Sequence, residues 1–414
     1  MEQQPENTRR NFLRQSALVG GGLLLAGAWP SFAAGQTPDP KHARLFQPFR
    51  FKQGLALRNR VVMAPMTTWA SNDDYTVSDE EVAYYRRRVQ GVGLVITGCT
   101  PVAPSGIGFT HQFAGYDDSF TPSLRKLATA AKSGGAPAIL QIFHAGNKAL
   151  AALIPQGDIV SASDSQVAAT AFIPAAACRA LREAEIQALI KAFGDTTRRA
   201  IEAGFDGVEL HGAHGFLLQN FLSPLTNQRT DQWGGSLENR LRFPLAVVAE
   251  VQRVIKAHTT RPFLFGYRVT AEEHEPGGLR LDETYVLLDR LVRAKVDYLH
   301  LSLEHLLSDK PAGNPTGKTI VELVLNRVAG KVPVLAAGGI RQPDEAVQAL
   351  ALGLSLVAVA HGLVMNPDWV ELVQAGKSAQ LQTALRKSTL QANAVPPKLW
   401  AFIEGAKGWF DVVD

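Results

Sequence analysis

Two histidines three residues apart, His211 and His214, follow a short apolar run, Phe205 to Leu210, that is typical of a buried strand. Two imidazoles held at this spacing where a strand ends can both contact one oxygen atom of a small molecule. The pair therefore predicts redox or acid–base chemistry on a carbonyl compound. A zinc pair or two packed histidines are the alternatives. A zinc site would need a third ligand that is not obvious in the sequence, so we predict no metal.

Further polar or small residues follow the other apolar runs of the chain. They are Thr67, Cys99, Gln141, His144, Arg268, Ser302, Gly338, Gly339, Ala360 and His361. The set combines a fixed cation, an amide, imidazoles and a Gly-Gly turn. Backbone N–H groups at such a turn can approach an anion closely, and barrels often bind phosphate there. A phosphate joined to a planar group with carbonyl and imide edges describes FMN, although a sugar phosphate fits the same residue types.

The elements that must position these residues repeat as strand, loop and helix from Phe49 onward. The predicted strands are Arg60–Met66, Gly93–Cys99, Pro137–Phe143, Asp206–Leu210, Pro262–Val269, Asp297–Ser302, Val332–Ala336 and Ser355–Ala360. Amphipathic stretches between them predict helices, among them Glu183–Ala203, Arg240–Ala257, Leu281–Ala294 and Pro343–Leu352. Eight alternations predict an α/β fold, a (β/α)₈ TIM barrel. The alternative is a doubly wound open sheet, but the glycine-rich turn usual after its first strand is missing.

Composition excludes several classes of function. The chain has 414 residues with 42 basic and 38 acidic side chains, a formal net charge of +4. No dense block of Lys and Arg stands out in its body, so we predict no nucleic-acid partner. Only two cysteines occur, Cys99 and Cys178. They are too few for a Cys-ligated iron–sulfur cluster within this chain, and a disulfide between them stays open.

The first residues have the order of an export signal: basic, then apolar and Gly-rich, then small near Ala33. Adjacent Arg9 and Arg10, followed by Phe12, resemble a twin-arginine signal, which exports folded proteins. We therefore expect the protein in the periplasm. An ordinary secretory signal or an uncleaved anchor is the alternative. The apolar run is too short to span a bilayer comfortably, so we predict no stable membrane span.

Four segments are predicted along the chain. Residues 1–33 are the twin-arginine export signal, residues 34–44 a flexible linker, residues 45–378 the barrel with its ligand site and residues 379–414 a C-terminal tail. The tail contains several aromatic residues. We expect it to pack on the barrel or on a partner subunit, which leaves a homo-oligomer open.

Four motifs resemble those of the old yellow enzyme family of FMN-dependent ene-reductases, also described as NADH:flavin oxidoreductases. The motifs are residues 59–67, 141–146, 211–243 and 337–340, and the resemblance extends over roughly residues 45 to 400. It implies a (β/α)₈ barrel with FMN at its top. It also implies that FMN is bound by Pro65, Met66, Thr67, Cys99, Gln141, Arg268, Gly338, Gly339, Ala360 and His361.

The resemblance also implies roles for single residues. Thr67 would tune the flavin potential, Gln141 would pair with the pyrimidine ring, and Arg268 would stabilise the negative charge of the reduced flavin. Hydride would pass from flavin N5 to the β-carbon of an α,β-unsaturated carbonyl compound. His211 and His214 would then stabilise the charge that builds on the carbonyl oxygen, like an oxyanion hole.

Two positions depart from the family pattern. Most members have a tyrosine two residues after the second histidine, which protonates the α-carbon, whereas this chain has Phe216. A phenyl ring has no proton to give. Trp69 lies two residues after Thr67 and can only donate a hydrogen bond. Tyr116 and Tyr267 are further candidates for the proton donor. After the eighth strand the family usually has Gly-Arg, with the arginine on the phosphate, and this chain has Ala360 and His361.

These observations predict an exported FMN-dependent oxidoreductase that reduces the activated C=C bond of a small molecule such as an enone. Its electron donor is NAD(P)H or an unidentified periplasmic donor. We expect NAD(P)H to react poorly or not to be the physiological donor, because soluble nicotinamide nucleotides are expected to be scarce outside the cytoplasm. The alternatives are a flavin barrel acting as a dehydrogenase or demethylase, a degenerate ligand-binding flavoprotein, and a non-redox phosphate-binding lyase or isomerase.

Overall fold

The computed structural model describes residues 38–170, 174–313 and 316–414. The export signal predicted for residues 1–33 therefore lies outside the described residues. Within the described ranges, no helix combines the length and the apolar character needed to cross a membrane.

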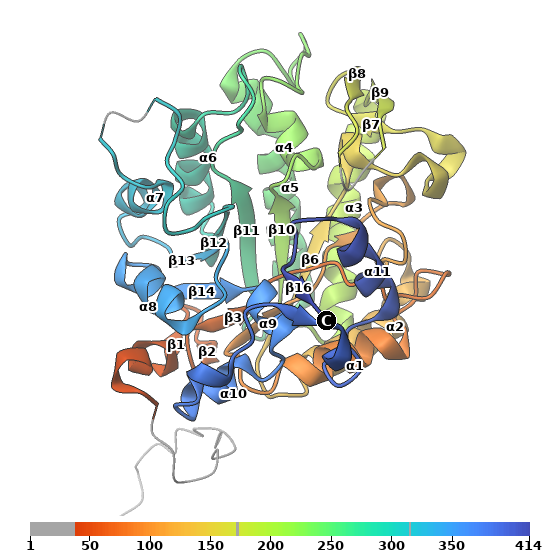
Figure 1. The fold of residues 1–414 in the computed structure, drawn as a ribbon. Coiled ribbons are helices and arrows are strands. Elements are labelled where there is room, and N and C mark those ends of the chain that lie inside the picture. Colours follow the sequence, from red (N-terminus) through yellow and green to blue (C-terminus); the bar gives the residue numbers. More distant parts are fainter. Residues whose placement is uncertain (1–37, 171–173, 314–315) are drawn as a thin grey trace, which may run out of the picture. The chain divides into compact units, whose positions relative to one another are not determined.

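Eight parallel strands form a closed barrel (Figure 1). They are β3 (Val61–Met63), β4 (Leu94–Ile96), β6 (Ala138–Phe143), β10 (Gly207–Gly212), β11 (Leu264–Thr270), β12 (Tyr298–Ser302), β13 (Val334–Ala337) and β14 (Leu356–Val359). The strands pair in chain order, and β14 pairs with β3 to close the barrel. Each predicted strand overlaps one of the eight, so the predicted (β/α)₈ barrel is confirmed.

Helices surround the barrel (Figure 1). The longer helices are α1 (Asp79–Arg88), α2 (Thr121–Ala131), α3 (Glu183–Ala203), α5 (Leu237–His258), α6 (Leu281–Arg293), α7 (Ile320–Val328), α8 (Pro343–Ala351) and α11 (Pro397–Gly405), and the short ones are α4 (Leu217–Leu222), α9 (His361–Met365) and α10 (Trp369–Gln374). The prediction Glu183–Ala203 matches α3 at both ends. Gly204 ends this helix with a φ of 89°, a left-handed conformation that glycine adopts without steric cost.

The inside of the barrel is apolar in its lower part, toward the amino ends of the strands. One buried cluster there contains Val62, Leu94, Ile139, Leu264 and Leu356 from five different strands. An antiparallel hairpin of β1 (Phe49–Arg50) and β2 (Ala56–Leu57) adds to this cluster from the amino-terminal end. Because barrels carry their chemistry at the carboxyl ends of the strands, the polar side chains at that end are the candidates for function.

Short elements complete the fold. The remaining strands are β5 (Thr100–Pro101), β7 (Val160–Ser161), β8 (Ser165–Val167), β9 (Ala176–Ala180), β15 (Leu385–Arg386) and β16 (Val412–Val413). The 3-10 helices are η1 (Pro40–Phe46), η2 (Pro104–Gly106), η3 (Asp118–Phe120), η4 (Gly146–Lys148), η5 (Ala151–Leu153), η6 (Pro155–Gly157), η7 (Ser378–Gln380) and η8 (Lys387–Thr389). Of these, β7, β8 and β9 form a small separate sheet.

The predicted linker of residues 34–44 needs correction at its end. Residues 40–44 belong to η1, which buries His42 and Leu45. The Nε2 atom of His42 lies 2.6 Å from Oδ1 of Asp344 at the start of α8. The segment is held because its polar side chain finds a fixed partner and its apolar side chain packs, which a composition rich in Gly, Pro and Asp does not reveal.

The C-terminal tail packs on the barrel of its own chain. Phe402 of α11 stacks on Trp69, which follows β3, with ring centroids 4.1 Å apart. Leu399 and Ile403 of the same helix are buried. In Figure 1 the dark blue C-terminal segment lies against the barrel near α9. Of the two packing partners predicted for residues 379–414, the structure shows the barrel.

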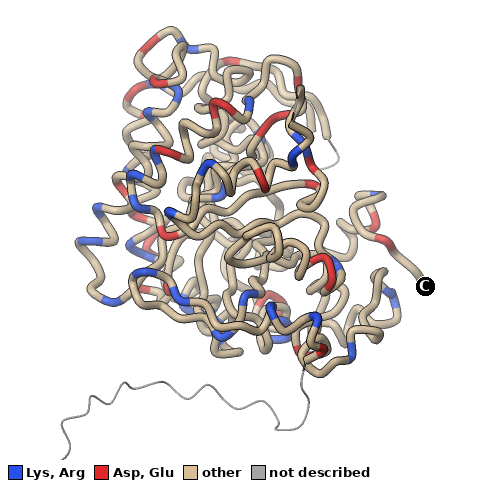
Figure 2. The backbone as a smooth tube through the Cα atoms, turned by 90° about the vertical axis from the view of Figure 1, so that its left-hand side faces the viewer, with Lys and Arg blue, Asp and Glu red and all other residues tan. Residues whose placement is uncertain are grey.

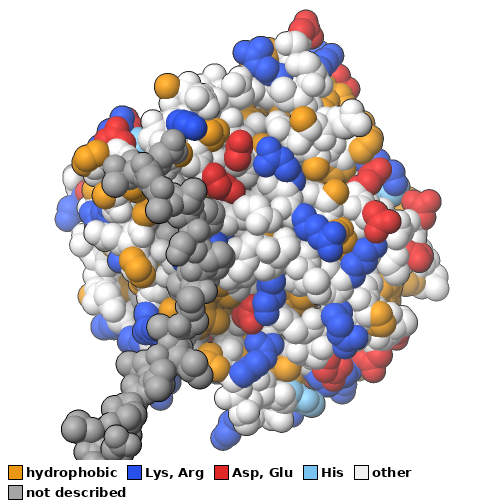
Figure 3. Space-filling model, turned by 90° about the horizontal axis from the view of Figure 1, so that it is seen from below, with side chains coloured by type: hydrophobic (Ala, Val, Ile, Leu, Met, Phe, Trp, Pro, Cys, Tyr) orange, Lys and Arg blue, Asp and Glu red, His pale blue; other side chains and the backbone are white. Residues whose placement is uncertain are grey.

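Charges of both signs are spread over the outer surface. Figure 2 shows Lys and Arg interspersed with Asp and Glu along the backbone, and Figure 3 shows both signs on the face seen from below. Several form ion pairs between neighbouring helices, such as Arg290 with Glu238 and Arg327 with Asp289. Such exposed pairs contribute little to stability individually, and they solvate the helices.

Candidate active site

The upper end of the barrel interior is polar, in contrast to its apolar lower part. His211 of β10 lies in register with Arg268 of β11, and Arg268 lies in register with His300 of β12. One layer lower, Glu209 of β10 is in register with Gln141 of β6. Side chains in register on neighbouring parallel strands point the same way, so these five residues converge inside the barrel.

The two predicted histidines meet at the carboxyl end of β10. Their ring centroids are 4.9 Å apart, and the rings are close to perpendicular. The backbone N–H of Ala213 donates to Nδ1 of His211 at 3.3 Å. This contact leaves the ring proton of neutral His211 on Nε2, where it can be donated to a ligand. Burial, followed by the charge of His214, lowers the pKa of His211 well below its usual range, so the ring is neutral.

His214 is held by its backbone in an unusual conformation. Its φ is +61°, a left-handed value that few residues other than glycine adopt. Its N–H donates to Oγ1 of Thr270 at 3.0 Å, and its C=O accepts from Nζ of Lys148 at 2.7 Å. Its Nε2 lies 2.6 Å from Oγ of Ser302. These contacts fix the ring of His214 in space beside His211, at the cost of backbone strain that is common at functional sites.

The pKa of His214 is also lowered well below its usual range. Loss of water around the ring is the main cause, followed by the charges of Arg268 and Lys148, although the residue as a whole stays exposed to solvent. Oγ of Ser302 accepts from Nη2 of Arg268 at 2.9 Å. The hydroxyl proton of Ser302 is then free to point at Nε2 of His214, an arrangement that leaves the ring proton on Nδ1.

A buried carboxylate below the histidines was missed in the sequence. Glu209 is fully buried, accepts from Nε2 of Gln141 at 2.7 Å and lies 3.0 Å from Nδ1 of His300. Burial alone would raise the pKa of Glu209, but His300 and then Arg268 more than offset this and lower it. A signal was available: an acidic residue two positions before His211 in a buried strand must have a polar partner.

Thr67 and Cys99 come together from neighbouring strands. Oγ1 of Thr67 lies 3.7 Å from Sγ of Cys99, and Gln112 donates to the Cys99 carbonyl at 2.7 Å. The loops approach closely because residue 98 is glycine: a Cβ there would lie 2.5 Å from the carbonyl oxygen of Met66. Pro65 and Met66 belong to the same loop. Burial raises the pKa of Cys99 to about 12, so its thiol is neutral. It forms no disulfide with Cys178, and both are buried free thiols.

Phe216 lies directly against the histidine pair. Its ring meets that of His211 edge to face at 4.8 Å and that of Phe143 at 5.0 Å, and only 6% of the residue is exposed. Tyr267 cannot take the place of the missing tyrosine, because it packs in the core between barrel and helices, on the opposite face of β11 from Arg268. Tyr116 packs edge to face on Phe120 at 4.9 Å. Phe216 and Phe143 therefore place apolar rings beside the histidines.

The Gly-Gly turn and His361 lie side by side, because β13 and β14 are neighbours in the barrel. Gly339 has a φ of +71°, which glycine permits. A Cβ on Gly338 would lie 2.8 Å from the backbone nitrogen of Leu306, so packing of the loop after β12 is enough to require this glycine. Ala360 directly precedes α9, and His361 is its first residue.

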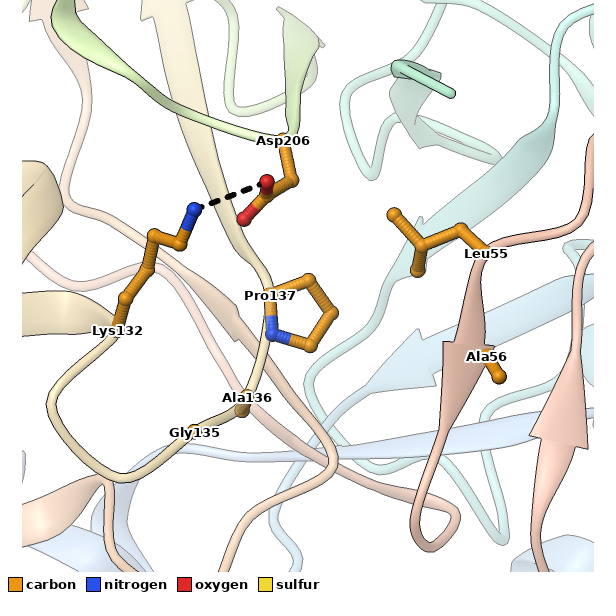
Figure 4. Close-up of a pocket in the computed structure, with 7 residues that line it drawn as sticks. All are labelled: Leu55, Ala56, Lys132, Gly135, Ala136, Pro137 and Asp206. Atoms are coloured by element: carbon orange, nitrogen blue, oxygen red, sulfur yellow. Dashed lines mark hydrogen bonds and ion pairs between the residues drawn. The ribbon is translucent and has the colours of Figure 1, made fainter. Parts of the chain in front are cut away.

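Two hollows in the described structure lie away from these residues. The one in Figure 4 has a volume of about 260 Å³ and is lined by residues at the amino ends of strands, among them Pro137 and Asp206. Asp206 is paired with Lys132 and Arg261 and accepts from the backbone of Ala138. Its carboxylate thus links the amino ends of β6 and β10. The convergent polar groups are at the opposite end, where barrels carry their chemistry.

A sequence model of the NADH:flavin oxidoreductase / NADH oxidase family matches residues 44–380. The chain belongs to this family. It is therefore an FMN-dependent oxidoreductase of the old yellow enzyme type, as the motifs suggested. The match covers the barrel and ends within the C-terminal segment, between α10 and β15.

Individual relatives agree with the family assignment. The chain is 43% identical over 381 residues to the probable NADH-dependent flavin oxidoreductase YqiG of Bacillus subtilis (strain 168), covering 91% of this chain and 100% of that protein. It is 38% identical to the NADH:fumarate oxidoreductase of Klebsiella pneumoniae (strain 342), covering 87% of this chain but only 39% of the relative. A structure of morphinone reductase in complex with tetrahydroNAD matches with a TM-score of 0.69 and 27% identity, covering 89% and 98% of the two chains.

The upper barrel fits the family's cofactor on its own geometry. Arg268 is a buried cation whose Nε has no hydrogen-bond partner, so it can serve an acceptor. Gln141 commits one N–H to Glu209, which orients its amide and leaves the amide oxygen as an acceptor. Donor and acceptor edges of this kind suit the carbonyl and imide groups of a flavin. The neutral thiol of Cys99 and the hydroxyl of Thr67 add small groups at the same end of the barrel.

Proposed function

We propose that this protein is an exported FMN-dependent ene-reductase that reduces the activated C=C bond of α,β-unsaturated carbonyl compounds. Bound FMN would supply the hydride-transfer chemistry. We assign its binding to the residues that the sequence motifs indicated, with Arg268 and Gln141 on its polar edge and Thr67 and Cys99 beside it. The assignment is supported by the convergence of these side chains at the upper end of the barrel.

One observation carries the proposed substrate class: a neutral histidine pair with a fixed tautomer. Because Nδ1 of His211 is occupied by the Ala213 N–H, Nε2–H is the donor that remains for a ligand. His214 would add a second donor from a ring held by its strained backbone. Two neutral donors favour an oxygen that becomes negative during reaction, such as the carbonyl oxygen of an enone. Nearby Arg268 and Lys148 keep the local potential positive.

The proton for the substrate carbon must then come from a group other than Phe216 and the histidine pair. Phe216 has no proton, and both flanking rings, His211 and Phe143, pack on its faces and edges. We assign this proton to water. A slow second half-reaction follows, because a positioned acid contributes about 10²- to 10⁴-fold to such a step. If protonation is too slow for turnover, the protein is a ligand-binding flavoprotein, and this is the second candidate function that Phe216 favours.

The names of two relatives support NADH as the electron donor. The Bacillus relative is named as NADH-dependent over its full length, and the Klebsiella relative is named for NADH and fumarate. The present chain spans little more than a third of the Klebsiella protein, so that activity is not transferred as a whole. The names run against our expectation of a poor reaction with NAD(P)H. The test is stopped-flow reduction of the bound flavin by NADH and NADPH at micromolar concentrations. Fast reduction would contradict the expectation of a poor reaction, and slow reduction would support it.

Export rests on the N-terminal pattern alone. We propose that residues 1–33 direct the folded, FMN-loaded protein to the periplasm through Arg9 and Arg10. The test is Arg9→Lys with Arg10→Lys in the full chain, followed by fractionation. Loss of the mature protein from the periplasm supports a twin-arginine route. Unchanged export indicates an ordinary secretory signal, and wild-type protein that stays in the cytoplasm refutes export.

The central experiment is spectroscopic. Purified protein should be yellow, and titration with a phenol should give a long-wavelength charge-transfer band. After reduction by dithionite without oxygen, addition of an enone should restore the oxidised flavin spectrum. His211→Ala should abolish phenol binding while keeping the flavin, whereas His144→Ala is a control for loss of a neighbouring buried histidine. Undiminished enone reduction by His211→Ala would contradict the proposed site.

A further inference from the structure

The candidate phosphate end of the site carries a neutral side chain where the family usually has arginine. Burial, followed by the positive charge of Arg341, lowers the pKa of His361 to about 4. The ring packs on Phe410 with centroids 4.1 Å apart and lies 5.8 Å from that of Trp409. At neutral pH His361 therefore brings no positive charge, yet a phosphate monoester needs a cation nearby.

Arg341 is a cation at this place. It follows Gly338 and Gly339 by two or three residues, on the loop between β13 and α8. Its backbone carbonyl accepts from Nε1 of Trp369 at 2.8 Å, and a Cβ on Gly362 would lie 3.3 Å from that same oxygen. The loop of Arg341 is thus packed on the start of α9, beside His361.

The guanidinium of Arg341 is paired with a carboxylate from the C-terminal tail. Nη1 of Arg341 bonds Oδ2 of Asp411, and both side chains are partly exposed. Asp411 follows Trp409 and Phe410 directly, so three consecutive tail residues contact the two polar side chains of this end. The carboxylate of Glu345 accepts from the backbone N–H of Arg341 at 2.7 Å, so it uses the backbone and not the guanidinium.

We propose that Arg341 binds the FMN phosphate in place of the arginine missing at position 361, and that Asp411 of the C-terminal tail competes with the phosphate for it. Without cofactor the guanidinium keeps an acidic partner. With cofactor the dianionic phosphate replaces the single carboxylate. The tail itself need not leave, because the backbone of Asp411 is held separately: its C=O accepts from the N–H of Leu385 at 2.8 Å, next to the pairing of β15 with β16.

The proposal predicts opposite effects of two substitutions at one ion pair. Arg341→Gln should weaken FMN binding about 10- to 100-fold, the usual cost of losing a hydrogen bond to a charged group. Asp411→Asn should leave FMN binding unchanged or tighten it by up to about 5-fold, since it removes an exposed competing charge. If Arg341 only docks the tail, both substitutions break the same contact and shift binding in the same direction.

The experiment measures FMN release by diluting each holoenzyme and following the fluorescence of free flavin. Riboflavin, which lacks the phosphate, is titrated into the same proteins after FMN has been removed. Arg341→Gln should weaken FMN but not riboflavin, and Arg341→Lys should retain most of the FMN affinity. Arg327→Gln is the matched control, because Arg327 is a surface arginine paired with Asp289 away from this end.

Equal weakening of FMN and riboflavin by Arg341→Gln would overturn the proposal, as would weaker FMN binding by Asp411→Asn. If Arg341→Gln does not fold, Asp411→Asn still tests the proposal, because tighter FMN binding supports it and weaker FMN binding overturns it. The inference rests on FMN as cofactor and not on the proposed substrate. A variant that binds FMN normally but reduces no enone therefore bears on the proposed function alone.

Discussion

Replacing Glu81 by glutamine should change how the stability of the protein depends on pH. Glu81 is fully buried in α1, where its carboxylate accepts from Oγ1 of Thr68 at 2.7 and 2.8 Å and from Oγ of Ser71 at 3.1 Å. Its hydrogen-bond partners are hydroxyls and it forms no ion pair among the described residues. Burial raises its pKa from 4.5 to about 7, although the two hydroxyls act in the opposite direction.

The sign follows from the direction of the shift. A carboxyl whose pKa is higher in the folded than in the unfolded chain stabilises the fold when protonated. This contribution is complete below pH 4.5 and is lost as the pH rises through about 7. At about 1.4 kcal/mol for each pH unit between the two values, the full loss is about 3 kcal/mol. Between about pH 5 and about pH 8 it is about 2–3 kcal/mol, because part is already lost at pH 5.

Glutamine keeps the shape and an acceptor for Thr68 but has no proton to lose. The free energy of unfolding of Glu81→Gln minus that of the wild type should therefore rise by about 2–3 kcal/mol from about pH 5 to about pH 8. The assay is urea denaturation with excess FMN at both pH values. Glu80→Gln, at the exposed neighbouring position, is the control. A difference that stays within about 1 kcal/mol across this range would show that the Thr68–Ser71 loop lets water reach Glu81.

Substitutions at three further positions test other parts of the structure. Phe216→Tyr should speed re-oxidation of the reduced enzyme by an enone about 10-fold or more, measured by stopped flow, if its hydroxyl supplies the missing acid; no gain would refute that reasoning. Glu209→Ala should destabilise the protein by about 3–5 kcal/mol in urea, because Gln141 and His300 both lose their buried partner, and Glu209→Gln should cost less. Phe402→Ala should cost about 1–3 kcal/mol through lost stacking on Trp69, and a near-wild-type midpoint would place the tail elsewhere in solution.

The barrel could be predicted from sequence because each of its layers follows a local rule. The strands are short apolar runs, and α3 begins and ends where polar and glycine residues interrupt an amphipathic pattern. The first described residues were predicted less well. Residues 40–44 lie in η1 because His42 meets Asp344, 302 positions away, and no local pattern contains such a contact. Tertiary partners of this kind decide the order of a short segment.

The residues of the candidate site could be predicted from the sequence, but the hydrogen bonds between them could not. The sequence indicates His211, His214 and Arg268 at strand ends. It does not indicate that Ser302 joins Arg268 to His214, or that Glu209 lies beneath them. These links depend on the register between strands that are some 30 to 90 residues apart. The register is fixed by the closure of the whole barrel, and sequence patterns describe only one strand at a time.

The two departures from the family pattern have different physical consequences. At Phe216 the chain loses a proton donor, and the adjacent ring of Phe143 supplies no substitute. At His361 the chain loses a charge, and the neighbouring Arg341 can restore it. Cofactor binding can thus be retained while carbon protonation is weakened. A protein with tight FMN, tight phenol binding and slow enone turnover is the combination that this geometry favours, and Phe216→Tyr and Arg341→Gln separate its two causes.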